Sequence, residues 1–286
     1  MSSEPRDDLD RFRQGVLTRQ EFLARLASLA GGIAAASAMS PLLEAGAAGE
    51  NEAPKEATPL RTQDIKYPGE TGAVIAYLAR PEGDGKFPGV IVVHENRGLN
   101  RHIKDVTERI AREGFLALGP DALSPFGGTP EDADEARELI GKLDPDATLR
   151  NFLAAIKYLK AHPSFEGKVG VIGFCWGGRM ANQMAVHAPD LAAAVPYYGS
   201  QPAVEDVPKI KASLLLHYAG LDERINSGIP AYEAALKAAG VDYRLHVYQG
   251  AQHAFNNDSN PERYHPEAAR RAWQRTVAFL KRKLRT

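Results

Sequence analysis

The single cysteine of the chain, Cys175, is the residue best suited to nucleophilic chemistry. It is the centre of a Gly-x-Cys-x-Gly pattern at 173–177, directly after the apolar run 169–172. A sharp turn from a strand into a helix would lift the thiol clear of a sheet, and larger side chains two residues before and after it would collide. The backbone amide of Trp176 would then point at negative charge developing on a substrate oxygen. The pattern therefore predicts a nucleophile, and a helix beginning here would favour its thiolate form.

Two polar residues further along the chain could complete such a site. Asp222 follows the apolar segment 213–218, and His253 follows the segment 243–248. A cysteine nucleophile requires a histidine that takes the thiol proton and an acid that orients this histidine. The order nucleophile, acid, histidine is that of the α/β-hydrolases. We therefore predict a triad of Cys175, His253 and Asp222.

Each member of this triad also has a simpler interpretation. Cys175 could be a buried residue beside a turn, and Asp222 could cap a helix that follows it. Other histidines compete with His253 for the role of base, but only His253 lies in a loop just beyond the last predicted strand. The competitors are His94, His102, His162, His187, His217, His246 and His265.

Strand patterns alternate with helix patterns along most of the chain. Apolar runs predict strands at 73–79, 90–94, 115–118, 169–174, 192–197, 213–218 and 243–248. Helical spacing predicts helices at 103–113, 131–142, 146–161, 179–187, 231–239 and 266–284. This alternation predicts an α/β-hydrolase fold, with a mostly parallel sheet, helices on both faces and no large cap domain. The ligand site should lie at the carboxyl ends of the strands.

The composition argues against several classes of protein. The 286 residues include 35 basic and 36 acidic side chains, without the basic excess of a nucleic-acid-binding domain. Hydrophobic residues make up 44% of the chain, which predicts a globular core. One cysteine excludes an intramolecular disulfide and a cysteine-based metal cluster.

The first 58 residues differ from the rest and form a separate N-terminal segment with a linker. Arg19 is followed by Gln20 where a twin-arginine export signal has a second arginine, and 45–47 read Ala-Gly-Ala, a small-residue cleavage site. Either the segment is a degenerate signal for export to the periplasm, or it is an accessory helix of a cytoplasmic protein. Its glycines, serines and proline make it a poor membrane span. Residues 59–286 are the predicted catalytic domain.

The chain resembles the dienelactone hydrolases, also called carboxymethylenebutenolidases, over about residues 61–286. The segments that carry the resemblance are Gly-Phe-Cys-Trp-Gly-Gly at 173–178, Val-Val-His-Glu-Asn-Arg-Gly-Leu at 92–99, Leu-Gly-Pro-Asp at 118–121 and Gly-Ala-Gln-His-Ala-Phe at 250–255. The resemblance implies hydrolysis of a small ester or lactone by the Cys-His-Asp triad, without metal or cofactor. A homo-oligomer is compatible with it.

The resemblance also implies roles for residues in the second of these segments, at 92–99. Glu95 would lie beside Cys175 and help to switch the thiol to its thiolate when substrate binds, although a solvated loop carboxylate is the alternative. The backbone amide of Asn96 would join that of Trp176 in an oxyanion hole. Apart from the resemblance, the aromatic residues Phe126, Tyr198, Tyr197 and Trp176 would line an apolar substrate pocket, unless they belong to the core.

One departure from the family pattern concerns substrate binding. The family binds a substrate carboxylate with two arginines, one shortly after the Pro-Asp element and one after the catalytic histidine. Here residues 120–126 contain no arginine, and 254–257 read Ala-Phe-Asn-Asn. Arg97 or Arg101 could substitute. We therefore expect neutral or differently charged esters as substrates.

Two rival interpretations remain open from the sequence. One is a general carboxylesterase or a peptidase on the same fold, and the other is a non-catalytic binding protein with an inactive elbow. Fold alone does not decide between them.

Overall fold

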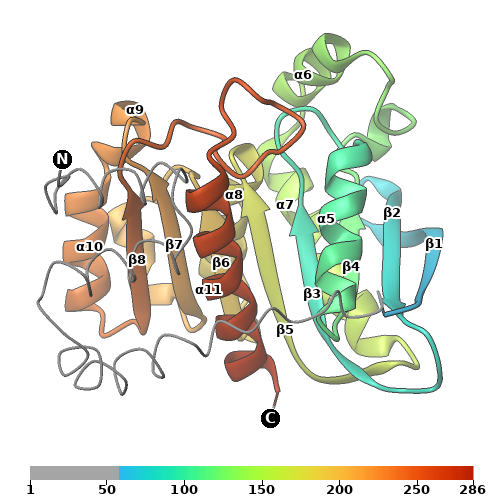
Figure 1. Cartoon of the computed structure of the whole chain (residues 1–286). Coiled ribbons are helices and arrows are strands. Elements are labelled where there is room, and N and C mark those ends of the chain that lie inside the picture. Colours follow the sequence, from blue (N-terminus) through green and yellow to red (C-terminus); the bar gives the residue numbers. More distant parts are fainter. Residues whose placement is uncertain (1–57, 286) are drawn as a thin grey trace, which may run out of the picture. The chain divides into compact units, whose positions relative to one another are not determined.

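The computed structural model describes residues 58–285, and these residues form one mixed sheet covered by helices (Figure 1). The strand order is β1-β2-β4-β3-β5-β6-β7-β8; β1 and β2 are antiparallel, β2 is antiparallel to β4, and the remaining neighbours are parallel. The strands are β1 (Leu60–Gly69), β2 (Gly72–Pro81), β3 (Phe87–Val93), β4 (Leu116–Pro120), β5 (Phe165–Phe174), β6 (Ala193–Tyr197), β7 (Ser213–Ala219) and β8 (Tyr243–Tyr248).

Helices cover both faces of this sheet, and each face has its own apolar core. The helices are α5 (Arg101–Arg112), α6 (Ala133–Gly141), α7 (Pro145–Ala161), α8 (Trp176–His187), α9 (Glu223–Asn226), α10 (Ile229–Ala238) and α11 (Pro266–Leu284). Helices α5 and α11 cover the face that is in front in Figure 1. Helices α6, α7, α8 and α10 pack on the other face.

The central strand β3 illustrates why the sheet is covered twice. Ile91 and Val93 contribute to the core under α7 and α8, whereas Val90 and Val92 contribute to the core under α5 and α11. All four side chains are completely buried. A continuous apolar run is what a parallel strand needs when both of its faces are covered.

The predicted α/β-hydrolase fold is confirmed, with differences at the amino-terminal edge. All seven predicted strands are present, but β1 was not predicted. Tyr67 is the one buried residue of the ten in β1, so the apolar alternation that marks a half-buried strand is missing. The predicted leader, including Arg19 and Gln20, falls on residues 1–57, outside the described part of the chain.

The helices within residues 58–285 include none that is long and apolar enough to cross a membrane.

Three short helices were also absent from the sequence prediction, because segments this short carry no periodicity. They are the 3-10 helices Ser124–Phe126 and Val204–Lys209 and the four-residue helix α9.

Candidate active site

Cys175 lies at a strained turn between β5 and α8. Its φ of 55° and ψ of -113° lie in a region of backbone conformation that residues other than glycine rarely adopt. Its N–H donates to the carbonyl oxygen of Tyr197 at 3.0 Å. A Cβ added at Gly173 would collide with the carbonyl oxygen of Gly177. A Cβ added at Gly177 would collide with backbone oxygens at the end of β3, including that of His94. The glycines therefore have the steric role that the sequence predicted.

His253 and Asp222 lie in the loops after β8 and β7 and contact each other. Nδ1 of His253 lies 2.5 Å from Oδ2 of Asp222, and both side chains are largely buried. The other carboxylate oxygen of Asp222 accepts a hydrogen bond from the N–H of Ile225 at 3.4 Å and so caps α9. The two interpretations of Asp222, histidine partner and helix cap, both hold, one for each oxygen.

Glu95 follows β3 and is held by two side chains from distant parts of the chain. Asn257 donates from Nδ2 to one carboxylate oxygen at 2.7 Å, and the hydroxyl of Tyr198 donates to the other at 3.4 Å. Asn257 was noted in the sequence only for standing where the family has an arginine. No sequence signal indicated that its amide would bind a carboxylate 162 residues earlier.

The environment of Cys175 disfavours its thiolate in the resting protein. Burial and the charge of Glu95 raise the pKa of the thiol to about 11. A hydrogen bond from the backbone N–H of Trp176 and the charge of Arg224 lower the pKa, but the first two effects are larger. The amide at the start of α8 therefore favours the thiolate, as the sequence predicted, but desolvation of the charge outweighs this one amide dipole.

Tyr198 is buried, which favours the alternative that it belongs to the core over a contact with substrate. Its exposed fraction is 1%, and its ring lies 5.1 Å from that of His253. Its φ of 38° is unusual for a residue other than glycine. Tyr198 thus contacts both Glu95, through its hydroxyl, and His253, through its ring, and it exposes little surface to a ligand.

Phe126 and Arg97, which were also predicted to contact substrate, are much more exposed than Tyr198. Phe126 is 45% exposed in the 3-10 helix after β4. Arg97 is half exposed, and its guanidinium lies 4.0 Å from Asp134 of α6. Asn96 is partly buried between Glu95 and Arg97, and Trp176 is the first residue of α8.

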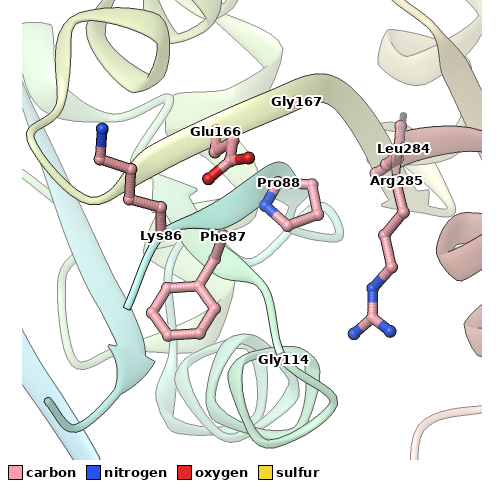
Figure 2. Close-up of a pocket in the computed structure, with 8 residues that line it drawn as sticks. All are labelled: Lys86, Phe87, Pro88, Gly114, Glu166, Gly167, Leu284 and Arg285. Atoms are coloured by element: carbon pink, nitrogen blue, oxygen red, sulfur yellow. The ribbon is translucent and has the colours of Figure 1, made fainter. Parts of the chain in front are cut away.

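A separate cavity of about 340 Å³ lies at the opposite edge of the sheet (Figure 2). Lys86, Phe87 and Glu166 line it from the amino ends of β3 and β5, and Arg285 reaches it from the end of α11. The triad candidates lie at the carboxyl ends of the strands, so this cavity is remote from them. No group of three potential metal-ligating side chains occurs among the residues that the structure describes.

Comparisons with known proteins identify the family of the chain. The model of the family described as "Dienelactone hydrolase family" matches residues 74–284. A Yersinia pestis protein named "Putative carboxymethylenebutenolidase" is 36% identical over 233 aligned positions, and the match covers 76% of this chain and 86% of that protein. "Protein usf" of Aquifex pyrophilus is 36% identical over 217 aligned positions, and the match covers 73% of this chain and 93% of that protein.

A solved structure is also similar to this chain. The crystal structure named "Putative Dienelactone Hydrolase" from Klebsiella pneumoniae is 31% identical, with a TM-score of 0.71, and the match covers 78% of this chain and 99% of that one. Since the family model spans well over half of the chain, the protein belongs to the dienelactone hydrolase family and is a carboxylic ester hydrolase.

Proposed function

We propose that the protein hydrolyses an ester or lactone through a thioester on Cys175, with His253 as base and Asp222 as its orienting acid. The observation that carries this proposal is the 2.5 Å contact between His253 and Asp222 at the edge of the sheet where the Cys175 turn ends β5. With Nδ1 bound to the carboxylate, Nε2 of His253 is the nitrogen available for proton transfer.

In the first half of the reaction, His253 takes the proton of Cys175 and the thiolate attacks the carbonyl carbon. The backbone amides of Asn96 and Trp176 stabilise the oxyanion of the tetrahedral intermediate. As the intermediate collapses, the bond to the leaving oxygen breaks and His253 returns the proton to that oxygen. An alcohol leaves, or the opened end of a lactone remains attached to the acyl group.

In the second half, water clears the thioester. His253 takes a proton from the water, the hydroxide attacks the thioester carbonyl, and the carbon–sulfur bond breaks. The carboxylic acid leaves and the sulfur regains a proton. Because a thioester must still be cleared by water, some general esters should acylate Cys175 faster than they turn over.

The raised pKa of Cys175 gives Glu95 a defined role in this scheme. With a pKa of about 11, roughly one thiol in 10⁴ is ionised at pH 7. The carboxylate of Glu95 is the second largest cause of this shift, after burial. A substrate that displaces or neutralises Glu95 would therefore lower the pKa of the thiol only when there is something to attack, which protects Cys175 from side reactions between turnovers.

The absence of two arginines favours neutral esters over substrates with a carboxylate. Residues 120–126 and 254–257 lack the two arginines with which the family binds a carboxylate. Arg97 is half exposed and 4.0 Å from Asp134, a distance at which the ion pair is weak and the guanidinium remains available.

A panel of esters and lactones with wild type, Cys175→Ala and Cys175→Ser tests the chemistry. We expect Cys175→Ala to lose turnover of every substrate that the wild type hydrolyses. Cys175→Ser should be far slower than wild type, since the site is built around a sulfur nucleophile. Equal rates for Cys175→Ser and wild type would mean that the thiol has no specialised part.

A second comparison, of p-nitrophenyl acetate with dienelactone, tests the substrate class. We expect the wild type to favour the neutral ester. Efficient dienelactone hydrolysis that is lost in Arg97→Ala would contradict this and would show that the carboxylate site has moved. Arg137→Ala is the matched control, because Arg137 is also exposed and also lies 4.0 Å from Asp134.

A further inference from the structure

His94, the residue after β3, is completely buried and has hydrogen bonds at both ring nitrogens. The N–H of Ala122 donates to Nε2 at 3.1 Å. Nδ1 lies 2.6 Å from the carbonyl oxygen of Glu95. The ring therefore joins the loop after β4 to the backbone that leads into Glu95 and Asn96.

These two partners fix which nitrogen of His94 carries the hydrogen. Because the Ala122 amide can only donate, Nε2 must be the unprotonated nitrogen. In a neutral imidazole the hydrogen is then on Nδ1, which donates it to the carbonyl oxygen of Glu95. Burial also lowers the pKa of His94, so the neutral ring is the stable form.

The Pro-Asp element after β4 holds the Ala122 amide in place. Oδ1 of Asp121 accepts hydrogen bonds from the N–H of Leu123 at 2.9 Å and from the hydroxyl of Thr129 at 2.8 Å. Oδ2 accepts a hydrogen bond from the N–H of Thr129 at 2.7 Å. Asp121 is itself buried, so the turn that presents Ala122 to His94 is closely fixed.

The bond to Glu95 sets the direction of the next amide. In a trans peptide the C=O and the N–H point in opposite directions. With its carbonyl oxygen bound to His94, the peptide between Glu95 and Asn96 must point the Asn96 N–H away from the His94 ring. The carbonyl oxygens of Val93 and His94, just before this peptide, pack on Gly177 in the first turn of α8, so the chain enters Glu95 and Asn96 from beside that turn.

The same ring supports the other proposed oxyanion donor. The indole of Trp176 stacks on His94, with ring centroids 5.3 Å apart and planes 8° from parallel. Phe152 of α7 contacts the indole from another side, at 6.2 Å. The residue that carries the second donor amide is therefore held against His94.

We propose that His94 is a positioning residue that presets both amides of the oxyanion hole, through its Nδ1–H bond to Glu95 and its stacking on Trp176. This rests on the proposed function, in which the Asn96 and Trp176 amides bind the oxyanion. His94 touches neither substrate nor the reacting sulfur in this scheme.

A matched pair of variants separates the two bonds of the ring. In His94→Asn, the side-chain NH₂ can replace Nδ1 and donate to Glu95. In His94→Gln, the side-chain oxygen can replace Nε2 and accept from Ala122, but the bond to Glu95 is lost. We expect kcat to fall about 10²-fold in His94→Gln, as when one oxyanion donor is removed, with KM little changed, and to recover in part in His94→Asn.

Two reactions of Cys175 separate an oxyanion effect from a structural one. Acylation by p-nitrophenyl acetate passes through an oxyanion, whereas alkylation by iodoacetamide displaces iodide from carbon and forms none. We expect the acylation rate of His94→Gln to fall about 10²-fold while its alkylation rate stays close to that of wild type. Thermal unfolding of each variant, monitored by circular dichroism, establishes that the folded form is assayed.

Each other outcome overturns the proposal in a distinguishable way. If acylation and alkylation fall together in His94→Gln, or if acylation is unchanged, His94 does not act on the oxyanion hole although the proposed function stands. Equal losses in His94→Asn and His94→Gln would show that the Nδ1–H bond is not the cause. A wild type that is never acylated at Cys175 would overturn the proposed function and this role of His94 with it.

Discussion

His253 and His94 lie at the same edge of the sheet, yet their hydrogen bonds fit them for opposite tasks. His253 binds a carboxylate through Nδ1, which stabilises a positive charge on the ring and leaves Nε2 for a substrate proton. Both nitrogens of His94 bind backbone groups, which are satisfied only while the ring is neutral. The difference teaches that the partners of a histidine, and not its place in the fold, decide whether it moves protons.

His217 extends the comparison into the core. It is completely buried, with Nδ1 2.9 Å from the hydroxyl of Tyr248 and Nε2 3.1 Å from that of Thr276. Burial first, and then the charges of His246 and Arg275, lower its pKa well below the usual range. Like His94, it is a neutral structural histidine, and the experiments below should separate it from His253.

The largest effect is expected for His253→Asn. Removal of the general base should lower kcat/KM for an accepted ester about 10⁴-fold, at the upper end for such groups, because the thiol is protonated at rest. His187→Asn, at an exposed histidine near the end of α8, is the control and should retain wild-type activity. Retained turnover in His253→Asn would contradict the assignment of His253 as the base, since another histidine would then have that role.

A loss of about 10³-fold in kcat/KM is expected for Asp222→Asn. Asparagine is as good a helix cap as aspartate, so the bond to Ile225 should survive and α9 should remain folded. What is lost is the negative charge that holds His253 in the tautomer with its free nitrogen facing the thiol. Activity close to wild type would mean that Asp222 serves only as the cap.

A shift in pKa, without a change of fold, is expected for Glu95→Gln. The carboxylate raises the pKa of Cys175, so its removal should move the pH midpoint of thiolate formation to lower pH. Glutamine keeps an oxygen for the Asn257 amide. Ultraviolet absorbance of the thiolate during a pH titration measures the midpoint, with Glu223→Gln, at an exposed site, as the control. An unchanged midpoint would remove Glu95 from the control of the thiol.

The smallest effect concerns stability and not activity. The pKa of His217 in the folded protein lies below its unfolded value of about 6.5, so the unfolded chain binds the extra proton and stability falls as the pH drops below about 6.5. One such group contributes a slope of about 1.4 kcal/mol per pH unit. Urea unfolding between pH 4 and 7 should give a shallower slope for His217→Gln than for wild type or His187→Asn. Equal slopes would mean that His217 is charged in the fold.

The sequence predicted the fold and the sharp turn at Cys175 because both depend on local patterns. Completely buried strands such as β3 appear as continuous apolar runs, and the elbow at Cys175 needs glycines at fixed spacing. Strand β1 was missed because an edge strand with one buried residue has no apolar period. The division of the chain near residue 58 stays a prediction.

The supporting residues of the site could not be predicted, since they depend on contacts between distant segments. Asn257 reaches Glu95 across 162 residues, and the burial of Tyr198 follows from the packing of whole strands. His94 was considered only as a competitor of His253 for the role of base. Its bonds to Ala122 and Glu95 depend on where the loop after β4 lies, which no local pattern encodes.

The most direct test of the proposed thioester is to trap it. Wild-type protein mixed with p-nitrophenyl acetate, quenched in acid and digested, should have one acetyl group on the peptide that contains Cys175, as identified by mass spectrometry. The acetyl group should disappear with time, and Cys175→Ala should never acquire it. Acetylation of a different residue, or hydrolysis at the wild-type rate by Cys175→Ala, would contradict the account.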